Sequence, residues 1–481
     1  MNAEALSSGT SSPKEGFMKK NSFLIALILM FAIMLAPLPE GLTSAGKNSI
    51  AVFVFALIVW LFRPFAEAAS SLLILAFLII FQVTKQKDVF GALGSDTNFL
   101  VLSGLIISVA MAKTNLAKRM ALTIITKFGK NSSMLLLSLM AVNFAIAFLM
   151  PSGTARSTLL LPIALAVIAA LGVKEGEKSN IAKQVTLTVP AADHFATSSI
   201  LTATGSNILA IEMVKQATGT TVYYSDWLLW GLVPNIMLAL IWWVMIKRMF
   251  PSKNKSMDIS SFQTDLKEMG SLSKDELRVL AIFGGTVILW MCDRWTGLNA
   301  AAVALLSASL LFVPKVGVLN WKETNKKINW GLIVFNAAAI ASGAALGKTK
   351  ATNWVIDGIF DKLNLHNMSP YMVLGVILAI TMLIIVLTSS KTGRITMLVP
   401  ILIGFAQTLE INPLFLIMPV VMLNAHHFVF PFNAKSNLIY FGTGHIHMED
   451  MVKSGTYISL IGIIVFVLTA MTYWKVVGLT F

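Results

Sequence analysis

Apolar stretches long enough to cross a membrane recur along the whole sequence. The uninterrupted ones are predicted spans at 23–37, 50–62, 70–84, 98–112, 227–246, 279–297, 298–314, 329–347 and 454–476. A run of about 20 apolar residues matches the thickness of the hydrocarbon core of a bilayer. The strict apolar–polar alternation of a transmembrane barrel is absent from the sequence. The pattern therefore predicts an all-α polytopic membrane protein.

Four further apolar stretches contain a polar break. Two of them, 132–172 and 369–410, are predicted to form re-entrant helical hairpins. The other two, 185–215 and 412–445, are predicted to form broken helices. In lipid, backbone groups freed by a break have no water partner, so such breaks persist only where they are buried in protein or line a cavity. We therefore expect all four breaks to meet near a binding site.

The two hairpin tips carry the same motif. Residues 152–163 and 390–401 share the pattern S-x-T-x-R-x-T-x-L-x-P-I, with seven identities in twelve positions. This agreement is far above chance and indicates a duplication. Duplicated, interrupted segments in the two halves of a membrane protein mark the substrate site of a secondary transporter.

The distribution of basic residues predicts the orientation in the membrane. With about eleven full spans and the N-terminus inside, the inner segments hold 24 Lys and Arg and the outer segments hold nine, as the positive-inside rule requires. The predicted domains are a cytoplasmic tail, a first repeat, a cytoplasmic linker and a second repeat, at 1–20, 21–248, 249–278 and 279–481. The C-terminus then lies outside. The first hairpin opens to the cytoplasm and the second to the outside, which is an inverted repeat.

Composition agrees with this class of protein. Of 481 residues 56% are hydrophobic and 12% are charged, against about 25% charged in an ordinary soluble domain. The net charge of +14 could suit nucleic acid, but 33 of the 37 basic residues lie in predicted loops, such as the basic loop at 113–131 and the polar loop at 348–368, and no nucleic-acid module is present. The single cysteine, Cys292, excludes an intrachain disulfide.

Four basic residues lie outside the loops, in the hairpin tips or the second broken helix. They are Arg156, Lys391, Arg394 and Lys435. A charge in the bilayer interior is costly unless a cavity shields it, so each is a functional candidate. Away from the ends of the spans, the only intramembrane acids are Asp193 and Glu212. The excess of positive charge favours an anion.

Polar groups of the right kind accompany these cations. Ser152, Thr154, Ser390 and Thr392 offer hydroxyls beside helix N-termini, whose free N–H groups attract carboxylates. Arginine adds bidentate pairing and lysine adds a compact charge. Two alternatives remain open. The arginines can instead bond carbonyls freed by the breaks or pair with Asp193, and the hydroxyls can cap the helices.

At these residues the chain resembles the divalent anion:sodium symporter family, over roughly residues 20–478. That family has two Ser-Asn-Thr tips that bind substrate carboxylate and help to form two sodium sites, which are completed by breaks matching 204–207 and 433–437. The resemblance implies substrate-binding roles for Ser152, Gly153, Thr154, Arg156, Asn207, Ser390, Lys391, Thr392, Arg394 and Asn437. It also implies a homodimer and an elevator-like motion.

The chain departs from that motif at two positions. Gly153 and Lys391 stand where the family has Asn. The variant at 151–156, P-S-x-T-A-R, is similar to citrate:succinate antiporters and plastid 2-oxoglutarate/malate translocators, which exchange without sodium. Lys391 and Lys435 are therefore predicted to supply the positive charge that sodium brings elsewhere.

The sequence thus predicts a secondary active transporter in a bacterial plasma membrane. We expect sodium-independent exchange of di- and tricarboxylates such as succinate, malate, 2-oxoglutarate and citrate. A sodium-coupled dicarboxylate symporter is the first alternative, and an anion channel or membrane-embedded enzyme is the second. The expected partners are small carboxylate anions and the lipid bilayer, not nucleic acid. No cofactor or metal is expected, because the sequence shows no metal cluster or nucleotide motif.

Overall fold

The computed structural model describes residues 13–129, 131–173, 179–252, 259–351, 354, 369–388 and 390–481. Across these residues the chain is helical, without a β-strand. Seven of the described helices are long and apolar enough to cross a membrane, and five shorter ones are also apolar. The predicted class, an all-α polytopic membrane protein, is confirmed. The number of eleven spans stays a prediction, and the predicted polar loop at 348–368 lies mostly outside the described residues.

The described residues of the first half form eleven α-helices and two short 3-10 helices. They are α1 (Pro13–Leu35), α2 (Ser44–Phe62), α3 (Glu67–Ile80), α4 (Gln86–Gly91), η1 (Ala92–Gly94), α5 (Asp96–Thr114), α6 (Leu116–Phe128), α7 (Ser132–Leu149), α8 (Gly153–Ala170), α9 (Asn180–Ser199), η2 (Leu201–Ala203), α10 (Gly205–Thr218) and α11 (Tyr224–Met249). Helices α7 and α8 form the first interrupted pair, and α9 and α10 the first broken helix.

The second half contains a second interrupted pair and a second broken helix. Its described helices are α12 (Ser260–Glu268), α13 (Lys274–Met291), α14 (Asp293–Thr296), α15 (Ala300–Leu310), α16 (Trp321–Asn325), α17 (Trp330–Lys348), α19 (Pro370–Leu387), α20 (Lys391–Thr408), α21 (Pro413–Leu423), η4 (Pro431–Asn433), α22 (Lys435–Phe441), α23 (Met448–Met471) and α24 (Tyr473–Val476). Helices α19 and α20 form the second interrupted pair, and α21 and α22 the second broken helix.

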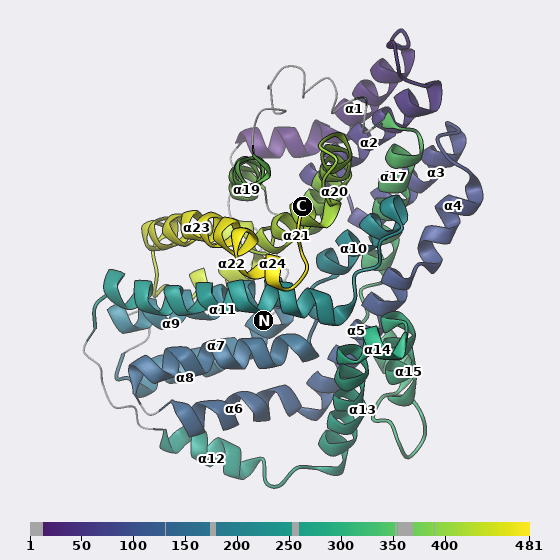
Figure 1. The fold of residues 1–481 in the computed structure, drawn as a ribbon. Helices are drawn as coiled ribbons and strands as arrows, with labels where there is room; N and C mark the ends of the chain where they lie inside the picture. The colour runs from purple at the N-terminus through teal and green to yellow at the C-terminus, as the bar shows by residue number, and fades with distance from the viewer. Residues whose placement is uncertain are drawn as a thin grey trace.

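Helices α9 and α21, the first parts of the two broken helices, form the centre of the fold. Figure 1 shows α7, α8, α9 and α11 running side by side, and α9 packs against each of the other three. Every residue of α21 from Leu414 to Leu423 is buried, as is every residue of α9 from Val185 to Ser199. Helices buried all round are expected at the core of a large helical protein.

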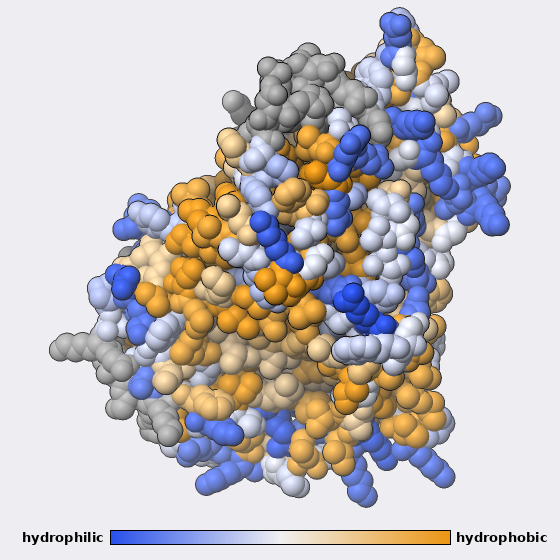
Figure 2. Space-filling view, in the orientation of Figure 1, coloured by the Kyte–Doolittle hydropathy of each residue, from blue (hydrophilic) through white to orange (hydrophobic). Residues whose placement is uncertain are grey.

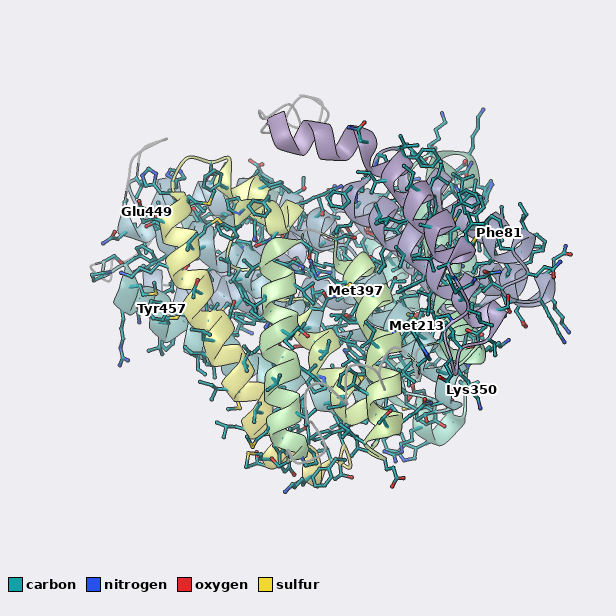
Figure 3. The ribbon with its side chains drawn as sticks, turned by 90° about the horizontal axis from the view of Figure 1, so that it is seen from above. Phe81, Met213, Lys350, Met397, Glu449 and Tyr457 are labelled. Carbon is teal, nitrogen blue, oxygen red and sulfur yellow. The ribbon has the colours of Figure 1, made fainter. Side chains whose placement is uncertain are left out.

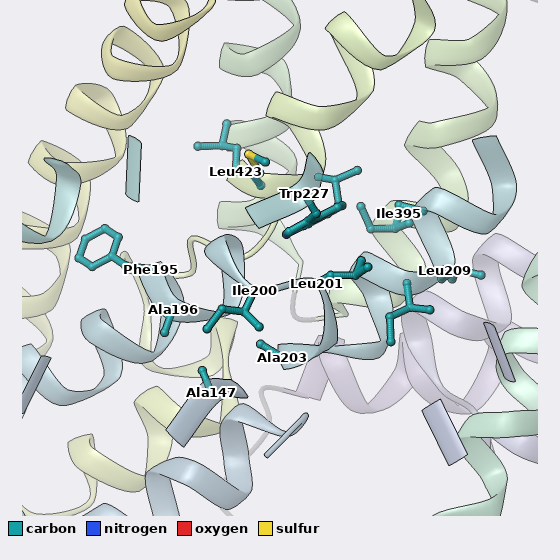
Figure 4. Packing of buried hydrophobic residues seen from close by; sticks show 14 of the residues in the cluster. Ala147, Phe195, Ala196, Ile200, Leu201, Ala203, Leu209, Trp227, Ile395 and Leu423 are labelled. Atoms are coloured by element: carbon teal, nitrogen blue, oxygen red, sulfur yellow. The ribbon is translucent and has the colours of Figure 1, made fainter. Parts of the chain in front are cut away.

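Each repeat also packs against the broken helix of the other. Helix α22 lies on α8, and α10 lies on α20. Figure 4 shows the first break from close by, with Ile200 and Ala203 of the break near Ala147 of α7, and Ile395 of α20 on the far side of Leu201. The two breaks are therefore enclosed in protein, as the missing backbone hydrogen bonds require.

Apolar side chains cover part of the outer surface. Figure 2 shows them gathered across the middle of one face, with hydrophilic side chains toward its margins. On α23, Leu460, Ile464 and Leu468 are each more than half exposed and recur every four residues. Such an unpaired apolar stripe suits contact with lipid. The chain is an integral membrane protein with several apolar helices.

The basic segment 113–131, predicted as a loop, is mostly the helix α6 instead. Leu116, Leu122 and Ile125 recur at helical spacing and are buried, while Lys118 between them is exposed. The linker also contains a helix, α12, which packs on α6 and buries Phe262. Amphipathic periodicity inside a charged segment is the signal that the loop prediction missed.

Arg119 fixes this linker to the rest of the protein. Its guanidinium pairs with Glu276 at 2.6 Å and donates to the carbonyls of Met269 at 2.9 Å and Gly270 at 2.8 Å. Glu276 is 2% exposed and also caps α13 by accepting from the Ser273 backbone N–H. The pair therefore holds the start of α13 against α6.

Candidate functional site

The first hairpin tip begins α8 with a serine cap. The Ser152 hydroxyl accepts from the Ala155 backbone N–H at 3.3 Å. Thr154, two residues further on, is exposed and can reach a ligand. A Cβ on Gly153 would lie 2.5 Å from Asp193 Oδ2, so glycine permits the close approach of that carboxylate. This contact explains why a residue with a side chain, such as Asn, does not occupy position 153.

Arg156 ties this tip to the first broken helix. Its Nε donates to Asp193 Oδ1 at 2.7 Å and its Nη2 to Thr197 Oγ1 at 2.6 Å. Its Nη1 donates to the carbonyls of Met150 and Ala203, which the breaks have freed. The side chain is completely buried. The guanidinium therefore acts on the protein itself, which was the alternative role, and its direct contact with substrate stays a prediction.

The second tip repeats this arrangement. Ser390 caps α20 by accepting from the Gly393 N–H at 3.1 Å. Arg394 is buried; it donates to Asn424 Oδ1 at 2.6 Å and to both the carbonyl and hydroxyl oxygens of Thr388 at 2.9 Å. It also donates to Nε2 of His427. Arg394 therefore closes the second tip as Arg156 closes the first.

The residue that orients each arginine differs between the repeats. Asp193 accepts from Nε of Arg156, whereas Asn424 accepts from Nε of Arg394. Asn424 also donates to the Lys391 carbonyl at 3.1 Å, which holds the start of α20. The sequence reasoning missed Asn424. A polar residue directly after the buried run of α21, three positions before His427, was the available signal.

Asn207 and Asn437 satisfy backbone groups at the two breaks. Asn207 donates to the carbonyls of Thr197 at 2.8 Å and Ile200 at 3.2 Å. Asn437 donates to the His427 carbonyl and, at 3.2 Å, to that of Phe430. Since buried carbonyls need donors, these amides stabilise the broken helices. Their contact with substrate stays a prediction.

Histidines join the two repeats at the centre. Asn437 uses its amide N–H groups on carbonyls, so its Oδ1 accepts from Nε2–H of His194 at 3.0 Å. Arginine has no acceptor, so Nε2 of His427 accepts from Arg394, while its Nδ1 donates to the Ala425 carbonyl at 2.9 Å. His427 is neutral because its Nε2 accepts a hydrogen bond and therefore carries no proton. His194 is neutral because its buried Nδ1 has no acceptor among the described residues for a second proton.

The two lysines lie in different surroundings. Lys391 is the half-buried first residue of α20, and its charge interacts with those of Asp193, Arg156 and Arg394. Lys435, predicted as a second interior cation, is an exposed first residue of α22 with no ion pair among the described residues. Exposure distinguishes Lys435 from Lys391, and the role of Lys435 in place of sodium stays a prediction. Thr392 follows Lys391 and is half-buried.

A cavity of about 460 Å³ lies beside α20, away from the tips. Its walls come from α4, α10, α17 and α20, including Met213, Gly343, Gly347, Pro400 and Gly404. Figure 3 shows Met213 of α10 near Met397 of α20, with Tyr457 and Glu449 of α23 on the opposite side of the molecule. The cavity therefore lies among α10, α17 and α20, which also contact one another.

The enclosed pair of helix breaks, with a serine-capped tip and a buried arginine in each repeat, defines a membrane transporter. The family model described as the sodium:sulfate symporter transmembrane region matches residues 18–480. The chain belongs to this family, so it is a transporter and not an enzyme. The resemblance of the sequence to the divalent anion:sodium symporter family is confirmed, and its similarity to the sodium-independent exchangers stays a prediction.

Individual relatives cover nearly the whole chain. A membrane protein of Cupriavidus necator is 29% identical over 473 residues, covering 94% of this chain and 92% of its own. The sodium-dependent dicarboxylate transporter SdcS of Staphylococcus saprophyticus is 28% identical over 489 residues, covering 95% and 92%. The crystal structure of the Alcanivorax borkumensis YdaH transporter has a TM-score of 0.57 at 10% identity, covering 97% of this chain and 98% of its own. That last likeness concerns the fold.

Proposed function

We propose that this chain exchanges di- and tricarboxylates across a bacterial plasma membrane without sodium. The observation that carries the proposal is Lys391, whose ammonium stands at the start of α20 within electrostatic reach of both arginines. The relative SdcS is named a dicarboxylate transporter, which supports the substrate class. The family membership supports transport rather than a channel.

The two tips suit the two ends of a dicarboxylate. Helices α8 and α20 both begin at a tip, and their first N–H groups and dipoles attract carboxylates. Thr154 is exposed and Thr392 half-buried, so their hydroxyls are available, while Ser152 and Ser390 are engaged as caps. Arg156 and Arg394 serve to hold the tips in place.

Lys391 makes a sodium ion at the second tip unfavourable. Two unit positive charges about 4 Å apart repel by roughly 4 kcal/mol at an effective dielectric of 20. A fixed ammonium also cannot dissociate, so the empty carrier keeps its positive charge and crosses the membrane slowly. Crossing with a bound anion is faster, which yields obligatory exchange. Lys435, being exposed, contributes less to this barrier because water screens it.

Sodium-coupled symport is the second candidate. It is favoured by the name of SdcS, a sodium-dependent transporter. It is also favoured by Asp193 Oδ2, a buried carboxylate oxygen with no hydrogen-bond partner among the described residues, which is the kind of ligand that sodium prefers. Against it stand Arg156 and Lys391, whose charges act on the same carboxylate.

The transport cycle follows from the same proposal. We infer an elevator-like motion in which the tips move together past α17, in a homodimer with the N-terminus in the cytoplasm and the C-terminus outside. Gly343 of α17 lies directly against Met213 of α10, where an added Cβ would clash with the Met213 Cε, and Gly347 lines the neighbouring cavity. Small residues at these two positions let the helices approach closely and suit a sliding contact. The rest of this picture rests on the family resemblance.

Exchange by purified protein in liposomes tests the proposal. Uptake of labelled succinate should require internal succinate or malate, fail with internal lactate, and be unchanged when sodium is replaced by potassium or choline. Uptake into liposomes without internal substrate, driven by an inward sodium gradient, would instead establish the symporter. Lys391→Asn should weaken binding, and transport of lactate without any dicarboxylate would refute the substrate class.

A further inference from the structure

Asp193 holds an unused carboxylate oxygen at the first tip. Its side chain is completely buried, and its Oδ1 accepts from Arg156. Its Oδ2 has no hydrogen-bond partner among the described residues and lies against Gly153, the first residue of α8. One oxygen is enough to orient the arginine, so the negative charge of this side chain needs a further explanation.

The second repeat shows that the charge is not needed to orient an arginine. Asn424 accepts from Nε of Arg394 at 2.6 Å, much as Asp193 accepts from Arg156 at 2.7 Å. The neutral amide of Asn424 therefore orients the arginine of the second tip as the carboxylate of Asp193 orients that of the first. Unlike an amide, the carboxylate of Asp193 adds a negative charge to the site.

The charges around the two tips can be counted. Arg156, Arg394 and Lys391 are positive and Asp193 is negative, and these four interact. His427 is neutral because its Nε2 accepts a hydrogen bond, and His194 because its buried Nδ1 has no partner among the described residues. His426 is neutral too, because its Nε2–H donates to Asn235 Oδ1 at 3.0 Å while its Nδ1 has no partner among the described residues. The cluster therefore carries a net charge of two positive units.

We propose that Asp193 sets the number of carboxylates that the site accepts, and that this number is two. A dianion neutralises the cluster, whereas a trianion leaves one negative charge uncompensated in a buried place, which is costly. A monoanion leaves one positive charge uncompensated. This inference rests on the proposed function and narrows it, because it makes dicarboxylates preferred over tricarboxylates.

A matched pair of acids isolates charge from shape. Glutarate and tricarballylate share a three-carbon chain with carboxylates at both ends, and tricarballylate carries one more on the central carbon. Each is used to inhibit exchange of labelled succinate in proteoliposomes at pH 8, where both acids are fully ionised. The readout is the ratio of the two half-inhibitory concentrations, which does not depend on the amount of active protein.

The main variant is Asp193→Asn, which copies the amide of Asn424 and keeps an acceptor for Arg156. This variant raises the net charge of the cluster by one. The half-inhibitory concentration of tricarballylate should therefore fall at least tenfold relative to that of glutarate. Lys391→Gln lowers the net charge by one and should move the ratio the other way. The double variant restores the original charge and should return the ratio toward that of the unaltered protein.

Glu212→Gln is the control. Glu212 is a buried acid of the first repeat, held by Thr97 and Gln216 rather than by the arginines. Its removal should leave the ratio unchanged. Equal shifts for Glu212→Gln and Asp193→Asn would overturn the inference, as would an unchanged ratio in Asp193→Asn.

The remaining outcomes are also decisive. If Asp193→Asn does not fold, Lys391→Gln alone must still weaken inhibition by tricarballylate relative to inhibition by glutarate. An unchanged ratio in Lys391→Gln refutes the inference. If the unaltered protein exchanges glutarate but the variants fail these tests, the inference falls and the proposed function stands. If the unaltered protein exchanges no dicarboxylate, both fall.

Discussion

Gly153→Ala should destabilise the first tip although alanine favours helices. A Cβ at this position would meet Asp193 Oδ2 at 2.5 Å, whereas ordinary contact begins at 3.4 Å, so the carboxylate must retreat by about 0.9 Å. Its bond to Arg156, now 2.7 Å, would then be lost. A hydrogen bond to a charged group contributes about 1.5–3 kcal/mol, and breaking a buried ion pair costs about 3–5 kcal/mol.

The gain in helix propensity does not offset this loss. Alanine is better than glycine in a helix by about 1 kcal/mol, which leaves a net loss of roughly 0.5–4 kcal/mol. The matched control is Gly284→Ala in α13, where a Cβ would meet nothing within 4 Å. Thermal stability in detergent, followed by the loss of the monodisperse chromatographic peak, should fall for Gly153→Ala and hold or rise for Gly284→Ala. Equal stability of the two variants would refute the reasoning.

Two further predictions concern the ligand and the linker. Thr154→Ala and Thr392→Ala should each weaken succinate binding about tenfold, because a hydrogen bond to a charged ligand is worth roughly 1.5–3 kcal/mol; unchanged affinity in both would exclude these hydroxyls as ligands. Arg119→Ala should make α12 more sensitive to protease, whereas alanine at Arg278, whose exposed pair with Asp275 contributes little, should not. Burial works to raise the pKa of Glu276, but hydrogen bonds from Arg119 and Ser273 outweigh it and hold this pKa below its ordinary value. The stabilisation from ionised Glu276 is present above the ordinary pKa of about 4.3 and is lost as the pH falls through the lowered pKa. Protease resistance of the unaltered protein should therefore fall over this pH range, and that of Arg119→Ala should change less.

Much of the architecture could be predicted from the sequence. Helices need runs of apolar residues to cross lipid, and the polar breaks near Ser152 and Ser390 interrupt those runs visibly. Helix α8 begins at Gly153 and α20 at Lys391, directly after the serines of the duplicated motif. The short amphipathic helices α6 and α12 were harder to predict, because only a few apolar positions recur among many charged and polar residues. Their pattern becomes informative only when the positions of Leu116, Leu122 and Ile125 are compared.

The contacts of the site were less predictable, since they depend on which breaks meet in space. The sequence identified Arg156 and Asp193 as possible partners but did not decide between that pair and a substrate contact. It gave no reason to connect Arg394 with Asn424, which lies thirty residues away. It also treated Lys435 like Lys391, because both follow a predicted break. The two lysines differ in burial, and the burial of Lys435 depends on how α22 packs against α8.

The two repeats have divided the charge of the site unequally. In the first, Gly153 leaves room for Asp193, which neutralises Arg156. In the second, a lysine replaces the glycine, and the amide of Asn424 replaces the carboxylate. All of the excess positive charge therefore belongs to the second repeat, so the second tip should contribute more to the affinity for an anion. On the proposed mechanism Lys391 also stays charged when the ligand leaves, so the same tip should slow the return of the empty carrier. We therefore expect one residue, Lys391, to govern both the affinity for the anion and the requirement for exchange.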